Sequence, residues 1–176
     1  MDVLSIIKQE HREVAALIDE ANKCEAGDER LRELAEEIAN KLSMHLAIEE
    51  RLFYAQLKAR ADEEDDKVEV FEAYTEHAAA KGLMQMIESG RKPDEQFKAE
   101  VQVLGENVKH HVEEEESKVF GIARDLLEKD ELDEIGESWE KAKQRAERGA
   151  SSNGRGRTTS AKKRTTRRPS RRATRR

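Results

Sequence analysis

Apolar residues recur every three or four positions along most of the first 128 residues, which is the spacing of one buried face of an α-helix. Two turn-forming stretches and one acidic stretch interrupt this repeat, at residues 25–28, 89–94 and 62–66. Between the interruptions the pattern predicts four amphipathic helices, over about residues 3–24, 29–60, 67–88 and 94–128. Four such helices joined by short turns favour an all-α fold, an antiparallel up-down-up-down four-helix bundle over residues 1–128.

The residues at the interruptions agree with these boundaries. Gly27 suits the end of the first helix, and Asp28 suits the N-terminal cap of the second. Gly90 and Pro93 play the matching parts before the fourth helix, because glycine ends a helix well and proline starts one well.

The C-terminal quarter of the chain has a different pattern. A weaker apolar repeat of Leu132, Ile135 and Trp139 predicts a short fifth helix at about 130–148, within an accessory segment 129–148 on the outside of the bundle. From residue 149 the composition changes to Ser, Thr, Gly, Arg and Lys without an apolar stripe. Such a segment buries too little surface to offset its ordering entropy, so residues 149–176 are predicted to be a disordered basic tail.

Composition agrees with a helical protein and bears on its location. Charged residues make up 41% of the chain and aromatic residues 4%, which suits helices with one apolar stripe each and disfavours a sheet. The single cysteine, Cys24, excludes an intramolecular disulfide and fits a reducing compartment. Neither a signal-peptide pattern nor an apolar run of about eighteen residues is present, so we expect a cytoplasmic protein without a membrane partner.

The net charge of −6 is the sum of two opposite parts. Residues 151–176 hold eleven of the 33 lysines and arginines and none of the 39 acidic residues, which leaves −17 for residues 1–150. Basic side chains that neutralise phosphates release counterions, so residues 150–176 are predicted to bind DNA or another polyanion non-specifically, which suggests a place at the nucleoid. Two alternatives are a solubilising end and a tail that binds the acidic faces of its own bundle.

Polar residues interrupt the apolar stripe of every predicted bundle helix. Each stripe contains one histidine, and in two helices a glutamate follows it four residues later: His11, His45 with Glu49, His77, and His111 with Glu115. Positions i and i+4 lie on one helix face, about 6 Å apart along the axis, so these six side chains are expected to converge at one level of the bundle. Beyond the pairs, the stripes continue through Leu52 and Gln56 in the second helix and through Val119, Ile122 and Leu126 in the fourth.

These six residues are candidate metal ligands. A single histidine on an apolar face is more often a hydrogen-bonded core residue, and a single glutamate there more often belongs to a solvated face. The whole set favours metal, because burying unpaired carboxylates is costly and a pair of metal ions offsets that cost. His110 competes with His111, but its own stripe is less apolar, so we expect it beside the site or in solvent. Cys24 lies too far from the level of the histidines to be a ligand.

In this order the residues resemble the hemerythrin-like, or HHE, cation-binding family. The family pattern is a histidine, an HxxxE pair, another histidine and a second HxxxE pair, with an aromatic residue about nine positions after the second and fourth histidines. Here the pairs are His45-Leu-Ala-Ile-Glu49 and His111-Val-Glu-Glu-Glu115, and the aromatic residues are Tyr54 and Phe120. The match covers roughly residues 2–128, and its full order is far more specific than a single HxxxE pair.

The resemblance implies a non-haem di-iron centre with an oxo or hydroxo bridge, in which Glu49 and Glu115 bridge the two irons and the histidines complete the coordination. Imidazole and carboxylate ligands also suit manganese and zinc. Oxygen-carrying hemerythrins have a further histidine one turn before His77, where this chain has Ala73. Three roles fit the nearby Tyr74, namely a metal ligand, a hydrogen-bond partner of a ligand or a packing residue, and packing is the default expectation. Fewer protein ligands leave more positions for dioxygen, nitric oxide or peroxide.

Three functions fit these residues. The leading hypothesis is a hemerythrin-like protein that binds or senses dioxygen, nitric oxide or peroxide in oxidative or nitrosative stress, with a basic tail for nucleic acid. The second is a DNA- or polyanion-binding structural protein that uses the bundle as a scaffold. The third is a peroxide-decomposing enzyme with a di-iron peroxidase- or catalase-like activity.

Overall fold

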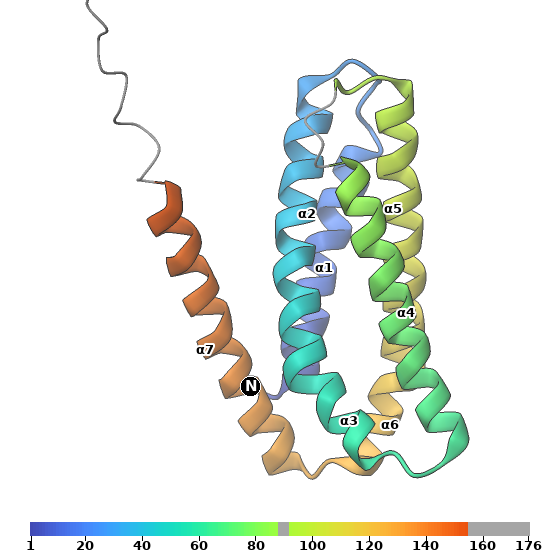
Figure 1. The fold of residues 1–176 in the computed structure, drawn as a ribbon, viewed down its shortest axis with the longest axis vertical. Coiled ribbons are helices and arrows are strands. Elements are labelled where there is room, and N and C mark those ends of the chain that lie inside the picture. The colour runs from blue at the N-terminus through green and yellow to red at the C-terminus, as the bar shows by residue number, and fades with distance from the viewer. Residues whose placement is uncertain (88–91, 155–176) are drawn as a thin grey trace, which may run out of the picture.

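The computed structural model describes residues 1–87 and 92–154, with only the backbone described for residues 149–154. Four helical rods run alternately up and down in Figure 1, which confirms the predicted antiparallel bundle. The first rod is α1 (Val3–Ala21) and the third is α4 (Glu64–Ile87). The second rod is α2 (Glu29–Glu49), the π-helical turn η1 (Glu50–Tyr54) and α3 (Ala55–Arg60). The fourth rod is α5 (Glu95–Glu114), the π-helical turn η2 (Glu115–Val119) and α6 (Phe120–Leu126).

Aspartate side chains cap three of these helices. Asp2, Asp28 and Asp94 accept hydrogen bonds from the backbone N–H groups of Ser5, Arg30 and Phe97 respectively. Gly27 has a φ of 92°, a left-handed conformation that glycine adopts without steric cost, and this lets the chain reverse before α2. The first helix ends at Ala21, three residues before the predicted end at Cys24. In the predicted turn at 89–94, residues 89–91 lie outside the described residues.

The two π-helical turns correct the predicted stripes. After Glu49 the predicted buried residues were Leu52 and Gln56, but the structure buries Phe53 and Leu57 completely. After Glu115 it likewise buries Leu127 in place of Leu126. A π-helical turn places one additional residue in the turn, which shifts the buried positions beyond it. After Glu115 the predicted Val119 and Ile122 stay buried, and Phe120 and Ala123 are buried completely beside them.

The bundle core consists of two apolar clusters on either side of a polar layer. One cluster lies toward the 22–28 loop, at the top of Figure 1, and includes Leu34, Leu42 and Phe97. The other lies toward the opposite end and includes Ile7, Phe53 and Phe120. The predicted metal-binding residues occupy the level between the two clusters.

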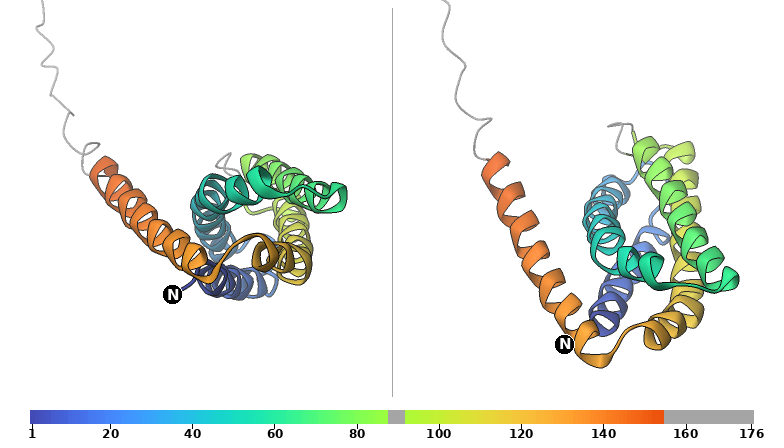
Figure 2. Two further views of the ribbon diagram at one scale, coloured as in Figure 1. Left: turned by 90° about the horizontal axis from the view of Figure 1, so that it is seen from below. Right: turned by 60° about the horizontal axis from the view of Figure 1, so that its bottom comes forward.

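The accessory helix α7 (Lys129–Gly154) packs outside the bundle against α1, α2 and η1, as predicted. Its C-terminal end points away from the bundle in Figures 1 and 2, whereas its Trp139 side chain is completely buried. The helix continues to Gly154, so the tail predicted to be disordered from residue 149 begins as a helix, because extending an existing helix costs little per residue. The rest of the predicted tail lies outside the described residues.

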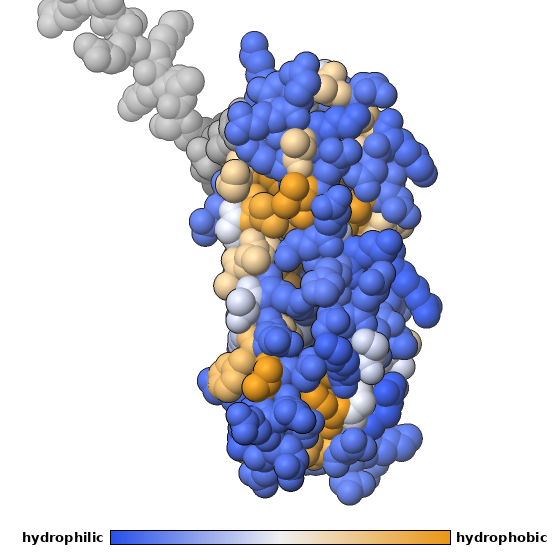
Figure 3. Space-filling view, turned by 90° about the vertical axis from the view of Figure 1, so that its right-hand side faces the viewer, coloured by the Kyte–Doolittle hydropathy of each residue, from blue (hydrophilic) through white to orange (hydrophobic). Residues whose placement is uncertain are grey.

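The right-hand face of the bundle as drawn in Figure 1 is mainly hydrophilic. Figure 3 shows the side that carries α4 and α5, where apolar residues form small separate patches among hydrophilic ones. Four large apolar side chains of these two helices are about half exposed, namely Val68, Phe71, Met86 and Val103. In the described part of the chain, no helix combines the length and the apolar character that crossing a membrane requires.

The packing of α1 against α5 gives a stability prediction. A Cβ atom added at Gly105 would lie 2.7 Å from Ile18 Cγ2, whereas a Cβ at Gly121 meets nothing within 4 Å. We expect Gly105→Ala to lower the free energy of unfolding by about 1–3 kcal/mol through overpacking. Gly121→Ala should instead raise it by about 0.5–1 kcal/mol, because alanine loses less backbone entropy in a helix. Chemical denaturation of the two variants and the unmodified protein tests the contrast, and equal stabilities would contradict it.

Candidate metal centre

The polar layer places the six predicted residues together, with one histidine from each of α1, α2, α4 and α5. Both glutamates are completely buried, and each histidine is at least 94% buried. Their nitrogen and oxygen atoms form three overlapping groups in which all atoms lie within 4.8 Å of one another: His11, His45 and Glu49; His11, His111 and Glu115; and Glu49, His77 and His111. The layer can therefore offer a cation four imidazoles and two carboxylates.

The two glutamates occupy equivalent places in this layer. Glu49 Oε2 lies 3.3 Å from His45 Nε2 on its own rod and 3.3 Å from His77 Nε2 on the neighbouring one. Glu115 Oε2 lies 3.8 Å from His111 Nε2 on its own rod and 3.2 Å from His11 Nε2 on the neighbouring one. Each carboxylate thus faces one histidine of its own HxxxE pair and one histidine from the other helical hairpin.

The atoms at the centre of the layer suit a metal better than they suit one another. Five of them are buried without a hydrogen-bond partner: the Nε2 atoms of His11 and His45, both carboxylate oxygens of Glu49, and Oε2 of Glu115. His77 Nε2 and His111 Nε2 lie 3.2 Å apart, so two ring nitrogens face a common point. Buried polar atoms are rarely left unpaired, and neutral imidazole and carboxylate are the donors that first-row transition metals and zinc prefer. The residues present therefore fit a metal centre.

The π-helical turns begin where the central carboxylates lie. Glu49 is the last residue of α2 before η1, and Glu115 is the first residue of η2. Directly after each, a second glutamate also reaches a site histidine: Glu50 contacts His77, and Glu116 contacts His11. Local π-helical turns are frequent at functional sites. Here they let two consecutive glutamates serve one site while the apolar stripe continues beyond them.

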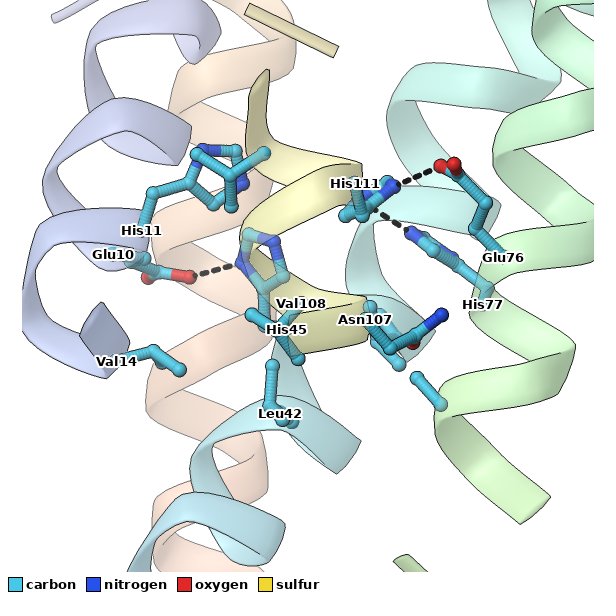
Figure 4. Close-up of a pocket in the computed structure, with 13 residues that line it drawn as sticks. Glu10, His11, Val14, Leu42, His45, Glu76, His77, Asn107, Val108 and His111 are labelled. Atoms are coloured by element: carbon cyan, nitrogen blue, oxygen red, sulfur yellow. Dashed lines mark hydrogen bonds and ion pairs between the residues drawn. The ribbon is translucent and has the colours of Figure 1, made fainter. Parts of the chain in front are cut away.

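A second shell of four glutamates, which sequence reasoning missed, orients the four histidines. Each histidine has its Nδ1 atom 2.8–3.1 Å from a carboxylate of another rod: His11 from Glu116, His45 from Glu10, His77 from Glu50, and His111 from Glu76. The four contacts form a closed ring, in which each rod supports the histidine of the next rod around the bundle. Because Nδ1 of each histidine is held in this way, its Nε2 atom points to the centre of the layer. Figure 4 shows two of these contacts, from Glu10 to His45 and from Glu76 to His111.

One signal in the sequence marks this second shell. Every supporting glutamate is the immediate neighbour of one of the six central residues, as Glu10 is of His11 and Glu76 is of His77. In a chain with 39 acidic residues, such neighbours resemble an ordinary solvated face, so the pattern acquires meaning only with the structure.

Cationic and hydrogen-bonding groups hold the second shell from outside. Lys81 Nζ lies 2.6 Å from Glu50, and Lys8 Nζ lies 3.3 Å from Glu116. His110, whose side chain is 64% exposed, lies 3.3 Å from Glu76, so it stands beside the site in contact with solvent, as expected. From the centre outward the site therefore alternates carboxylate, imidazole, carboxylate and cation.

Two tyrosines border the centre. The buried Tyr54 hydroxyl donates a hydrogen bond to Glu115 Oε1 at 3.0 Å, and burial together with the charge of Glu115 raises the pKa of Tyr54. Tyr74 donates to the backbone carbonyl of Glu50 and packs against the Tyr54 ring, which agrees with its expected packing role. Ala73 is buried in the neighbouring apolar cluster.

The charges of the two shells shift the pKa values of their neighbours. Burial disfavours the charged form of His45, but Glu49 and Glu10 outweigh burial and raise the pKa of His45 from 6.5 to about 10. Burial would raise the pKa of Glu10, but hydrogen bonds from His45 and Lys143 outweigh it and lower that pKa from 4.5 to about 2. Burial also opposes the charge on Glu49, yet the charge of His45 holds the pKa of Glu49 well below its ordinary value.

A small cavity adjoins the centre on the side of the 22–28 loop. Its volume is about 10 Å³, which is roughly what a cavity needs to hold one water molecule. The four histidines line one side, and apolar side chains that include Val14, Leu42 and Val108 line the other. The cavity therefore suits a ligand of very few atoms.

Comparison with known proteins places this site in a family. Residues 2–123 match the Hemerythrin HHE cation binding domain. A DNA nickase from Nostoc sp. is 25% identical over 143 residues, which are 81% of this chain and 39% of that protein, so the chain spans well under half of that relative. The crystal structure of a hemerythrin HHE cation-binding domain-containing protein from Mycobacterium kansasii has the same fold, with a TM-score of 0.74 at 18% identity, and the alignment covers 90% of this chain and 95% of that one.

We expect the metal-free protein to gain stability from this site mainly between pH 4.5 and 6.5. The raised pKa of His45 contributes stability that is complete below pH 6.5 and disappears as the pH rises through about 10. The lowered pKa of Glu10 contributes stability that is complete above pH 4.5 and disappears as the pH falls toward about 2. Thermal unfolding of chelator-treated protein from about pH 2 to about pH 10 measures both contributions, each as a fall of the unfolding temperature on its own side of the plateau.

Two variants separate the contribution of His45 from that of the rest of the chain. In His45→Gln the alkaline loss of stability should shrink, whereas His110→Gln, which changes an exposed histidine, should retain it. An alkaline loss of the same size in His45→Gln and the unmodified protein would contradict the charge assigned to His45.

Proposed function

We propose, from the premise that this chain belongs to the hemerythrin HHE cation-binding domain family, that its polar layer holds two metal ions between α1, α2, α4 and α5. The ligands in this proposal are the four central histidines and two central glutamates: His11, His45, Glu49, His77, His111 and Glu115. The observation that carries it is the group of buried ring nitrogens and carboxylate oxygens that face one another without hydrogen-bond partners. Glu49 and Glu115 each face two histidines from different rods, which suits carboxylates that bridge two ions.

Iron is the metal we assign, because mixed imidazole and carboxylate ligands inside a helical bundle suit it, although manganese and zinc accept the same donors. A bound di-iron centre would supply the chemistry that binds or senses dioxygen, nitric oxide or peroxide. The chain's own residues hold the imidazole rings through the four glutamates that contact their Nδ1 atoms, and the Tyr54 hydroxyl donates to Glu115. The cavity beside the histidines supports a ligand of one to a few atoms rather than a larger organic substrate.

Metal content tests this proposal. After iron-replete expression we expect about two irons per chain, with azide-dependent absorption bands in the visible and near-ultraviolet range. His45→Ala and Glu115→Ala should each lose at least one ion per chain, because each removes a donor from the centre. Glu113→Ala is the matched control, since it removes a glutamate of the same rod as Glu115 whose side chain is 68% exposed, and it should retain both ions.

Two results would count against the proposal. One is an unmodified protein that carries no iron, manganese or zinc after metal-replete expression. The other is a pair of variants, His45→Ala and Glu115→Ala, that retain the full metal content of the unmodified protein. In that case the bundle would be a scaffold, and these variants would change only its stability.

The basic segment supports a second, compatible function in binding nucleic acid. Residues 151–176 carry eleven positive charges and no negative one, and a relative that covers 81% of this chain is a DNA nickase. Because that relative is much longer than this chain, the comparison supports an association with DNA rather than the nicking reaction. We therefore place the protein in the cytoplasm, at the nucleoid, with the metal centre brought close to DNA by its tail.

DNA affinity with and without residues 150–176 tests this second function. The full chain should bind duplex DNA at low salt, and its affinity should fall steeply as salt rises, because counterions are released. Removal of residues 150–176 should abolish measurable binding. A full-length control with its eleven basic tail residues replaced by glutamine should behave like the truncated chain. Equal affinity of the full and truncated chains at low salt would exclude the tail as the binding element.

A further inference from the structure

We propose that α7 is a positioning element of the metal centre, in which Lys143 and Trp139 hold Glu10 and, through Glu10, the ligand His45. This inference rests on the proposed metal-binding function and adds a helix outside the bundle to it. It also predicts that metal binding and the docking of α7 strengthen each other.

Glu10 connects α7 to the centre through its two carboxylate oxygens. Its Oε2 atom lies 2.9 Å from His45 Nδ1. Its Oε1 atom accepts hydrogen bonds from Lys143 Nζ at 2.7 Å and from the indole nitrogen of Trp139 at 3.3 Å. One oxygen therefore serves the ligand, and the other serves α7.

The other three members of the second shell show what is unusual about Glu10. Glu50 supports His77, and the lysine that holds Glu50, Lys81, lies on the same helix as His77. Glu116 supports His11, and the lysine that holds Glu116, Lys8, lies on the same helix as His11. For Glu76, the outer partner, His110, is likewise on the helix of the supported histidine.

The helix of His45 does not supply such a partner to Glu10. Its lysine one turn before His45 is Lys41, and Lys41 pairs with Glu13, 3.2 Å away. Lys143 and Trp139 of α7 take the place that a residue of the ligand's own helix takes elsewhere in the ring. Among the four supporting glutamates, Glu10 depends in this way on a segment outside the bundle.

Trp139 also touches the ligand itself. Its side chain is completely buried, and its ring centre lies 5.5 Å from that of His45 in an edge-to-face arrangement. Beside Lys143, a crevice of about 70 Å³ lies between α7, α1 and α2. Lys143 and Glu147 line it from α7, and Lys41 and Met44 line it from α2. At this level α7 is thus not continuously packed on the bundle, and Trp139 and Lys143 make its link to the centre.

These contacts have an energetic consequence. With Nδ1 held by Glu10, the His45 ring keeps its Nε2 atom 3.3 Å from Glu49, pointing into the centre. Loss of the α7 contacts frees one oxygen of Glu10 and lets both side chains reorient, so part of the metal-binding free energy would be spent on restoring the geometry. Because coupling between two binding events is reciprocal, metal that binds more tightly when α7 is docked must also favour the docked state.

Zinc affinity measured by competition with a chelator is the direct test, because zinc accepts these ligands without redox chemistry. We expect Lys143→Met and Trp139→Phe each to weaken Zn²⁺ binding severalfold, up to about tenfold, which is the lower end of what losing the direct partner of a ligand costs, because Glu10 itself remains. Lys143→Arg should preserve most of the affinity, since it keeps a cationic donor. The matched control is Lys141→Met, because Lys141 lies on the same helix, 65% exposed, and pairs only locally with Glu137.

A second measurement uses the unmodified protein and does not depend on how the variants fold. Hydrogen exchange of residues 129–148 should slow when Zn²⁺ is added, because metal binding favours the docked state of α7 over transient opening. The unfolding temperature of each metal-free variant shows whether a loss of Zn²⁺ affinity reflects general destabilisation. For Lys143→Met we expect a loss of Zn²⁺ affinity larger than any fall in its unfolding temperature accounts for.

The outcomes distinguish this inference from the proposed function on which it rests. If the unmodified protein binds no Zn²⁺ and carries no other metal, the metal-binding function itself fails. If the unmodified protein binds Zn²⁺ and Lys143→Met binds it equally well, or if Zn²⁺ leaves the exchange of α7 unchanged, the positioning role of α7 is overturned while the metal centre stands.

Discussion

Two carboxylates with no access to solvent set the constraint on which the rest of the structure depends. Glu49 and Glu115 lie between two apolar clusters, where an uncompensated negative charge would lower the free energy of unfolding by several kcal/mol. Four imidazoles surround them, and those imidazoles in turn require acceptors for their outer nitrogens. The acceptors are glutamates that need cations or other donors, so one buried requirement extends outward, shell by shell, to the lysines at the surface.

The same constraint shapes the backbone. A continuous α-helix through Glu49 would keep the stripe on Leu52 and Gln56, and Phe53 and Leu57 would leave the core. The π-helical turn at Glu50–Tyr54 shifts the register so that the polar layer and the apolar cluster beyond it are both satisfied on one rod. The second π-helical turn repeats this arrangement in the other helical hairpin, so the two halves of the site are related by an approximate two-fold symmetry.

The sequence predicted the helices and the central residues because both depend on one signal, an apolar stripe with polar gaps. It could not predict the π-helical turns, since Leu126 and Leu127 are both leucine and the pattern does not choose between them. The role of the supporting glutamates could not be predicted from the sequence either, because it depends on contacts between rods. Glu116 and His11 are 105 positions apart, and Glu10 and Lys143 are 133 positions apart. Trp139 was placed on an outer helix correctly, but its burial against His45 comes from tertiary packing, which the apolar pattern does not show.

The closed ring of glutamate–histidine contacts makes the metal centre a property of the assembled bundle rather than of any one helix. Each rod supplies one histidine and supports the histidine of the next, so the displacement of one rod disturbs two contacts, and the pair between Glu116 and His11 closes the ring between the last rod and the first. Metal binding and bundle assembly should therefore share one free energy, as in other proteins whose ligands converge only on folding. The support of His45 passes through Glu10 to α7, and α7 leads directly into the basic segment. A displacement of α7 would therefore act on His45 through the single carboxylate of Glu10.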